Sequence, residues 1–284
     1  MPECLGKYFI HNGNLTSTSV FDDSFLNHPH YIYEVFRVID GVALFLEDHL
    51  DRLKRTCELS EHCHGFSVNQ IQRQVYHLID ANNFSYGNLK MAIYINAQKQ
   101  RCFLVYITEH QYPTDQQYEM GVPVALFKGI RNNPNAKVMD VKLRNATNLK
   151  KKELEVYETL LVDNEKCITE GSRSNVFFIY KGKVITPPVY DVLPGITRKH
   201  IIEICRQLSL PVSEEKVSAR SVVIMEAVFI SGTSRRVLPV NRIDDLDFDP
   251  DHPVTKRIQS AFNKKVSEYI SARKENRFFR DPKS

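Results

Sequence analysis

The feature that most constrains the fold is a pair of short apolar runs joined by a glycine- and serine-rich turn. Cys167 and Ile168 lead into the turn 169–174, and the apolar run 176–180 follows directly. Short runs of β-branched and aromatic residues bounded by Gly, Ser and Asn predict strands joined by a turn. Such turns leave backbone groups available to a ligand, and Glu170 stands in this one. The segment therefore predicts a sheet with chemistry at a strand end, although an isolated acid in a turn is more often only solvated.

The rest of the chain alternates between strand and helix patterns. Apolar residues three or four positions apart predict helices, and alternating or continuous apolar runs between turn residues predict strands. Helices are expected around 50–57 and 71–79, over 146–162, from 195 to 208 and around 258–270. Strands are expected at 8–13, 31–38, 42–46, 89–97, 102–108, 122–128 and 227–231.

These elements predict an α/β protein with two lobes. A smaller α+β domain is expected over 1–115, a linker and the start of the second domain over 116–130, and a larger α/β domain over 131–284. A chain of 284 residues is long enough to bury a core in each of two domains.

Composition points to an ordinary globular protein. Hydrophobic residues make up 42% and charged residues 25%, and the formal charge of +4 gathers into no basic stripe, which argues against nucleic-acid binding. No signal peptide opens the chain, and no apolar run approaches the roughly 20 residues that a membrane span needs. The six cysteines have no regular spacing, so we expect a reduced, cytoplasmic protein. Cys57, His62, Cys63 and His64 fit no zinc spacing, and no metal is expected.

Five further motifs accompany the run around Glu170, in a fixed order along most of the chain. They are Tyr33-Glu34-Val35-Phe36-Arg37, His49-Leu50-Asp51-Arg52-Leu53, Asp140-Val141-Lys142-Leu143-Arg144-Asn145, Leu193-Pro194-Gly195-Ile196-Thr197-Arg198 and Phe229-Ile230-Ser231-Gly232-Thr233-Ser234. With these motifs the chain resembles the class IV (fold-type IV) pyridoxal-phosphate enzymes, the family of branched-chain and D-amino-acid aminotransferases and aminodeoxychorismate lyase. The resemblance implies the fold-type IV architecture, pyridoxal 5′-phosphate as cofactor, and a homodimer.

The resemblance also implies roles for residues that would hold the cofactor. Lys142 matches the family's Schiff-base lysine, and Lys137, which follows a Pro-Asn break, is the competing choice. Glu170 matches the acid at the pyridine nitrogen. A phosphate group would meet Arg52, the helix start at Ile196 and Thr197, and the hydroxyl of Thr233.

Other matched positions concern the substrate. Tyr33 and Arg37 match residues that line the substrate side of the ring, although Tyr33 could equally be a packed strand aromatic. The backbone N–H groups of Ser234 and Arg235 match those that receive the substrate carboxylate in branched-chain enzymes. Arg235 and Arg236 stand where the family often has an acid, so they either favour an acidic substrate or face solvent or a dimer partner.

The expected function is therefore that of an aminotransferase. It would move an amino group from a branched-chain-like or acidic L-amino acid to a 2-oxo acid. The alternative is a 4-amino-4-deoxychorismate lyase that releases pyruvate and 4-aminobenzoate, because the cofactor motifs serve both reactions. A D-amino-acid aminotransferase is less favoured, because no arginine stands in Thr108-Glu109-His110-Gln111-Tyr112-Pro113, where those enzymes carry their carboxylate trap.

Overall fold

The computed structural model describes residues 3–27, 31–60, 65, 67–96 and 98–278. The chain divides into two compact units. Unit 1 consists of Met1–Gln111, Ala136–Met139 and Lys264–Ser284, and unit 2 consists of Tyr112–Asn135 and Asp140–Asn263. The first boundary between the units falls after Gln111, whereas the predicted smaller domain ended at residue 115. The short segment Ala136–Met139 and the end of the chain also belong to unit 1.

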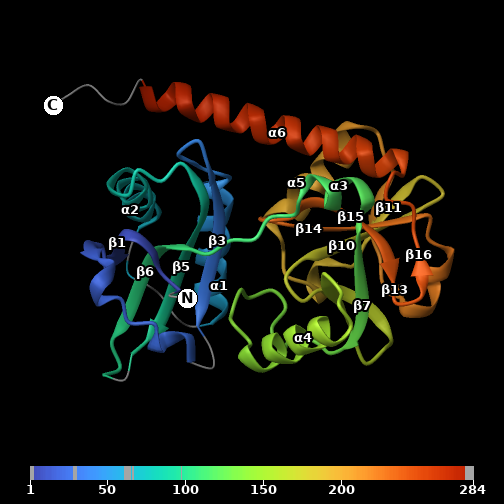
Figure 1. Cartoon of the computed structure of the whole chain (residues 1–284), viewed down its shortest axis with the longest axis horizontal. Coiled ribbons are helices and arrows are strands. Elements are labelled where there is room, and N and C mark those ends of the chain that lie inside the picture. Colours follow the sequence, from blue (N-terminus) through green and yellow to red (C-terminus); the bar gives the residue numbers. More distant parts are fainter. Residues whose placement is uncertain (1–2, 28–30, 61–64, 66, 97, 279–284) are drawn as a thin grey trace. The chain divides into compact units, whose positions relative to one another are not determined.

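Unit 1 is built on a six-stranded antiparallel sheet in the order β2-β1-β6-β5-β3-β4 (Figure 1). The strands are β1 Leu5–His11, β2 Asn14–Ser17, β3 Ile32–Ile39, β4 Val42–Ala43, β5 Tyr86–Ile95 and β6 Arg101–Thr108. Two 3-10 turns, η1 Thr18–Val20 and η2 Ser24–Asn27, follow β2. The segment Ala136–Met139 lies along the start of β3, where Val138 forms a bridge with Ile32.

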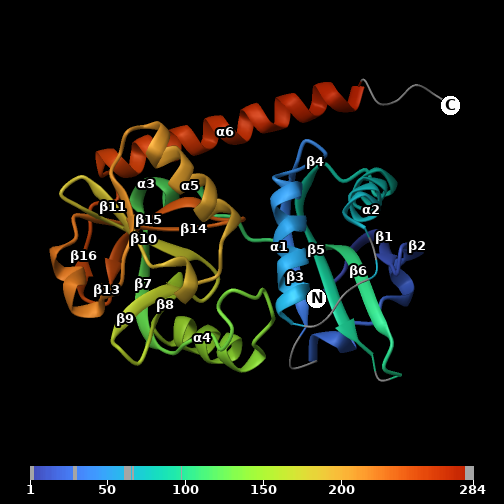
Figure 2. The same cartoon turned by 180° about the vertical axis from the view of Figure 1, so that it is seen from behind.

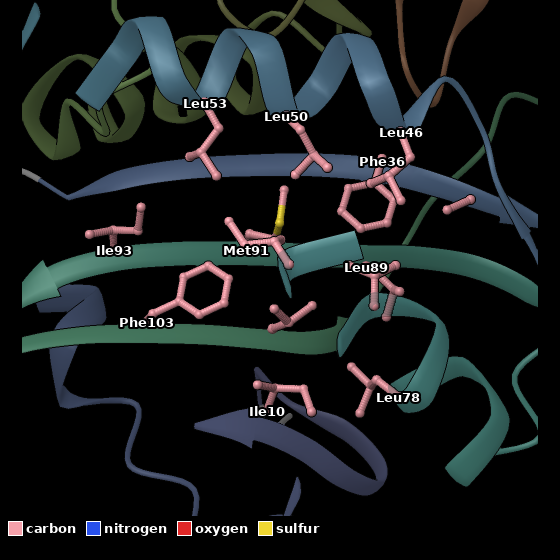
Figure 3. Close-up of a cluster of buried hydrophobic side chains, with 14 of the residues drawn as sticks. Ile10, Phe36, Leu46, Leu50, Leu53, Leu78, Leu89, Met91, Ile93 and Phe103 are labelled. Carbon is pink, nitrogen blue, oxygen red and sulfur yellow. The ribbon is translucent and has the colours of Figure 1, made fainter. Parts of the chain in front are cut away.

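Two helices, α1 (Leu46–Leu59) and α2 (Val68–Ala81), supply apolar side chains to the core of this unit. Figure 3 shows Leu46, Leu50 and Leu53 of α1 pointing at the sheet. They meet Phe36, Leu89, Met91 and other side chains of the same apolar cluster, including Leu78 of α2. Each such side chain contributes about 1.5–3 kcal/mol when it is fully buried. The predicted helical spacing is thus confirmed.

The β3–β4 hairpin turns at the predicted dipeptide. Asp40 and Gly41 both have positive φ, as a two-residue type I′ turn requires. The second strand is shorter than the expected 42–46, because Phe45 adopts a left-handed conformation (φ 52°) and starts α1 at the next residue.

Unit 2 is built on a mixed ten-stranded sheet in the order β12-β11-β10-β14-β15-β7-β8-β9-β13, with β16 paired to β15 (Figure 2). The strands are β7 Val122–Lys128, β8 Glu158–Val162, β9 Cys167–Gly171, β10 Asn175–Tyr180, β11 Lys183–Thr186, β12 Val212–Glu214, β13 Val217–Ser218, β14 Ala227–Gly232, β15 Arg236–Ile243 and β16 Leu246–Asp247. Three pairs are parallel: β7 with β8, β7 with β15, and β11 with β12.

The helical segments of unit 2 are α3 Asp115–Met120, α4 Val141–Glu153, η3 Val189–Asp191, α5 Ile196–Gln207 and η4 Ala219–Ile224. The last helix, α6 (Pro253–Phe278), belongs to unit 2 up to Asn263 and to unit 1 beyond it. None of the helices in the described part of the chain combines the length and the apolar character needed to cross a membrane.

The structure corrects the predicted helix over 146–162. Helix α4 ends at Glu153, and Glu155 then takes a left-handed conformation (φ 52°) that stops it. The residues that follow form strand β8, in which Leu160 is fully buried. Leu149 of α4 is 60% exposed. Leu160 thus belongs to a short, continuously buried run that forms a strand.

Candidate active site

Glu170 is a buried acid at the end of strand β9, and both of its oxygens are engaged. The Arg131 Nε donates to Oε1 at 2.8 Å, and the Leu193 backbone N–H donates to Oε2 at 3.1 Å. Arg131 follows strand β7 and was not predicted from the sequence. Each carboxylate oxygen has two lone pairs, so Glu170 can still accept a further N–H donor such as a protonated ring nitrogen.

Helix α5 begins at a close backbone approach. A Cβ added to its N-cap residue, Gly195, would lie 2.0 Å from Asn175 Oδ1, so any larger residue requires the Asn175 side chain or the helix start to shift. The amide of Asn175 is fixed by donating to Leu193 O at 2.9 Å. Gly195 offers no side-chain cap, which leaves the first-turn amides at Ile196 and Thr197 for another acceptor. An N-terminus of this kind attracts anions.

A buried hydroxyl lies beside this helix start. Ser231 on β14 pairs with Asn175 on β10, and its side chain is fully buried. In the described part of the chain, the Ser231 hydroxyl has no hydrogen-bond partner. A buried, unsatisfied hydroxyl close to unpaired helix amides fits a phosphate group, which accepts several hydrogen bonds at once.

The turn after Ser231 contains the predicted Thr233, Ser234 and Arg235, all half-buried. The Arg235 amide donates to Gly232 O at 3.1 Å and so closes the turn, which directs this N–H away from a ligand. The Arg235 guanidinium forms an ion pair with Glu158 at 3.0 Å.

The neighbouring Arg236 donates to Asn263 Oδ1 at 3.0 Å. Both arginines therefore have partners within unit 2. This geometry removes the basis for expecting them to select an acidic substrate.

In unit 1, Glu34 is fully buried between two predicted motif residues. Arg52 donates to both of its oxygens, each at 2.7 Å, and His49 Nδ1 lies 2.8 Å from Oε2. Burial alone would raise the pKa of Glu34, but the Arg52 guanidinium and the His49 hydrogen bond outweigh it and hold the pKa well below its usual range. Arg52, expected at a phosphate, is thus fixed by a bidentate pair.

His49 is held neutral beside this pair. Burial lowers the pKa of His49, and the charges of Arg52 and Lys137 lower it further, against the raising effect of Glu34. Because Glu34 accepts from Nδ1, we assign the proton of the neutral ring to that atom.

Lys137 contacts Tyr33 of β3. Its Nζ lies 4.9 Å from the centre of the Tyr33 ring, and its carbonyl accepts from the Tyr33 N–H at 3.1 Å. The Lys137 N–H donates to Thr56 Oγ1 on α1 at 3.2 Å. Lys137 is half-buried, and its segment is fixed at both backbone groups.

Lys142 lies elsewhere, in the first turn of α4 in unit 2. Asp140 is the N-cap of this helix and accepts from the Leu143 N–H at 2.9 Å. Lys142 is exposed, and no hydrogen bond or ion pair to it is found among the described residues. Asp140, two residues before Lys142, thus serves as a helix cap.

Comparison with known proteins places these motifs in a family. Residues 31–243 match the family described as amino-transferase class IV. The chain belongs to the class IV aminotransferases. A D-alanine aminotransferase from Staphylococcus haemolyticus is 29% identical over 262 residues, which cover 85% of this chain and 89% of that protein.

Solved structures share the fold of this class IV protein. The branched-chain amino acid aminotransferase of Escherichia coli matches with a TM-score of 0.83 at 22% identity, over 92% of this chain and 95% of that one. A Legionella pneumophila protein described as a candidate 4-amino-4-deoxychorismate lyase matches with a TM-score of 0.75 at 19% identity, over 88% and 96%. These matches confirm the predicted α/β fold of fold-type IV enzymes.

Two further polar groups occupy the sheet of unit 1 in this class IV chain. Arg37, a predicted site residue, is buried and donates to the Tyr86 hydroxyl. Lys90 on β5 is also buried and was not predicted; it donates to Glu3 Oε1 at 2.7 Å and to the Tyr31 hydroxyl at 3.2 Å. A lysine within the apolar run 89–93 was the available sequence signal.

The cysteine and histidine residues near the end of α1 form no site in the described part of the chain. Cys57 is buried in α1, where it packs in the apolar core. His62, Cys63 and His64 lie outside the described residues.

Proposed function

We propose that this class IV protein is a pyridoxal-phosphate-dependent aminotransferase in which Lys137, not Lys142, bonds to the cofactor. The observation that carries this choice is the position of Lys137 against the Tyr33 ring, in the segment that pairs with β3. Lys142, by contrast, is exposed on α4. A lysine that acts as a nucleophile needs a site that desolvates its amine, and an exposed helix position does not provide one.

The donor set fits the cofactor. When bound, pyridoxal phosphate supplies an electron sink for the substrate carbon that loses its proton. Glu170 would accept the N–H of the ring nitrogen, held in place by Arg131 and Leu193. The amides of Ile196 and Thr197 and the hydroxyls of Ser231 and Thr233 would hold the phosphate. Arg52, the predicted phosphate arginine, lies in unit 1, where its guanidinium is paired with Glu34.

Lys137 would also move the proton. Its Nζ would take the proton from the substrate Cα and hold it for return during the reaction. The amine can act in this way only when it is uncharged.

We propose apolar, branched-chain-like L-amino acids as donors and a 2-oxo acid as acceptor. Tyr31, Tyr33 and Ala92 form an apolar cluster on the face of the unit 1 sheet that carries Tyr33. An acidic donor loses support because Arg235 and Arg236 are bound within the protein. The lyase reaction is the alternative, since it needs the same lysine and acid. The implied homodimer stays a prediction that sedimentation would test.

The test compares the lysine variants K137A and K142A. Wild-type protein loaded with pyridoxal phosphate should show a visible absorbance band, and borohydride reduction followed by peptide mass analysis should place the cofactor on Lys137. K142A should keep the band and the activity. K137A should lose the band and about 100- to 10,000-fold in rate, the usual contribution of a positioned acid–base group.

The donor panel separates the two reactions. Conversion of the band by L-leucine or L-valine, with a 2-oxo acid formed, supports transamination. Reaction with aminodeoxychorismate alone, with release of pyruvate, would establish the lyase instead. A cofactor found on Lys142, or no visible band at all, would overturn the proposal.

A further inference from the structure

One buried carboxylate of unit 2, Glu158, has no role in the proposed transamination chemistry. It stands at the start of β8, with no exposed surface. Its oxygens accept from the Ser172 hydroxyl, from the Ser174 hydroxyl at 3.4 Å and from the Thr159 N–H at 3.1 Å, and Arg235 forms an ion pair with it at 3.0 Å. Burial would raise the pKa of Glu158, but Arg235 and these donors outweigh it, so the carboxylate is ionised. A fully buried charge is stable only with such compensation.

Arg235 is held from several sides as well. Its guanidinium lies 5.4 Å from the centre of the Tyr157 ring, and NH1 donates to Arg173 O at 3.4 Å. Its carbonyl accepts from the Tyr118 hydroxyl of α3 at 3.0 Å. Every one of these contacts is made to the protein, so the side chain lies over β8 and the turn at Arg173 and is not directed outward as a free cation.

Glu158 thereby joins two turns of unit 2. The first turn, 171–174, follows Glu170 directly and is closed by a bond from the Gly171 N–H to Ser174 O at 2.7 Å. The second turn, 232–235, contains Thr233 and Ser234 and is closed by the Arg235 N–H. Hydroxyls of the first turn and the guanidinium of the second bind the same carboxylate.

We propose that Glu158 and Arg235 are positioning residues, which fix the turn 232–235 against the turn that follows Glu170 so that the Ser234 amide is presented to the substrate carboxylate. This inference rests on the proposed function, because a substrate carboxylate must bind there. It assigns Arg235 a role through the backbone of its own turn. Arg235 does not recognise an acidic substrate side chain.

The kinetic test uses R235A, R235K and, as matched control, R236A. All three are measured with saturating pyridoxal phosphate on one apolar donor and on L-glutamate. R235A should raise KM about tenfold for both donors alike, with kcat within about twofold, since roughly one hydrogen bond to the substrate is misplaced. R235K should recover part of the loss, because an ammonium can still pair with Glu158. R236A removes the same charge one residue later, outside the Glu158–Arg235 ion pair, and should behave as wild type.

A second measurement does not depend on turnover. Hydrogen exchange of the peptide covering 230–238 should become faster in R235A and in E158Q, and stay unchanged in R236A. E158Q keeps the size of the side chain and its acceptor oxygen but leaves Arg235 without an opposite charge. If R235A fails to fold, R235K and E158Q still decide the question through this measurement.

Three results would overturn the inference. A KM increase confined to L-glutamate would make Arg235 a direct ligand of acidic substrates. Equal behaviour of R235A and R236A, in both KM and exchange, would show that the ion pair positions nothing. A large fall in kcat with unchanged KM would place the effect on the chemical step. If wild-type protein binds no cofactor, the proposed function fails, and the exchange experiment alone still tests whether the pair fixes the turn.

Discussion

The buried acid Glu34 of unit 1 should tolerate substitution poorly. It is fully buried, and Arg52 and His49 both depend on its oxygens. In E34Q a neutral amide replaces the carboxylate, so the buried Arg52 guanidinium loses the opposite charge that it contacts at both oxygens. Breaking a buried pair in this way typically costs about 3–5 kcal/mol. Urea unfolding of wild type and E34Q, followed by circular dichroism, should show a loss of this size.

A matched control is E153Q. Glu153 forms an exposed pair with Lys150 at the end of α4, at 3.5 Å. Exposed pairs of this kind contribute about 0–1 kcal/mol, so E153Q should unfold close to wild type. If both variants unfolded at the same urea concentration, the Glu34–Arg52 pair would not be a main source of stability in unit 1.

The sequence alone could single out Glu170 and Thr197 as candidates, because each stands in a local motif. Local motifs could not show which of the two lysines lies against another predicted site residue. Lys137 lies against Tyr33 because the segment Ala136–Met139 pairs with β3, about a hundred residues earlier. Motif spacing carries no information about such a distant pairing, whereas the Asp140–Leu143 cap that governs Lys142 is local.

At the scale of the element, helix α5 depends on glycine at its N-cap. A methyl group at position 195 would meet Asn175 Oδ1 at 2.0 Å, a distance that forces the Asn175 side chain or the helix start to move. G195A should therefore weaken binding of pyridoxal phosphate about tenfold or more, because the first-turn amides no longer converge on one anion. Cofactor titration by fluorescence would measure this change.

The double variant N175A/G195A separates the clash from other effects of the substitution. N175A alone loses the bond to Leu193 O and should weaken cofactor binding by itself. On that background the added methyl group meets no Asn175 oxygen, so the further effect of G195A should almost vanish. An unchanged effect of G195A on both backgrounds would rule out the clash as the cause.

Elements with a strong, local period were predicted well from the sequence. The i, i+4, i+7, i+8 spacing of Ile71, Val75, Leu78 and Ile79 gave α2, and all four residues are buried. The helix expected over 146–162 was wrong, because lysines and leucines of α4 run into the β-rich segment 156–162 without a proline or glycine between them. Only the left-handed conformation of Glu155 marks the boundary, and no residue type in the sequence signals it.

At the scale of the whole molecule, the order of elements along the chain does not give the composition of the two units. Unit 1 takes three separate segments of sequence, and the last begins within the continuous helix α6. No composition change or linker marks Lys264, since helical periodicity continues across it. Unit membership depends on contacts such as those of Tyr269 with Phe45 and Glu47, which join residues more than 200 positions apart.

Both units contain buried groups that titrate on the acid side, and this predicts the pH dependence of stability. The pKa values of Glu34 and Glu158 are lowered from 4.5 in the folded chain. The stability they contribute is present above 4.5 and is lost as the pH falls below it. The pKa of His49 is lowered from 6.5, so the unfolded chain takes up a proton first and stability falls as the pH drops below 6.5. The melting temperature should therefore decrease steadily from pH 7 to pH 4.

The variant H49Q separates the contribution of His49 to the pH dependence of stability from that of Glu34 and Glu158. Glutamine can still donate to Glu34 but takes up no proton, so H49Q should flatten the decrease between pH 7 and pH 5 and leave the steeper loss below 4.5 unchanged. H77Q is the control, because it replaces an exposed histidine of α2 and should follow the wild-type profile. A profile in which H49Q and wild type stay parallel from pH 7 to pH 5 would mean that the pKa of His49 is not lowered on folding, because His49 would then take up its proton equally in the folded and the unfolded chain.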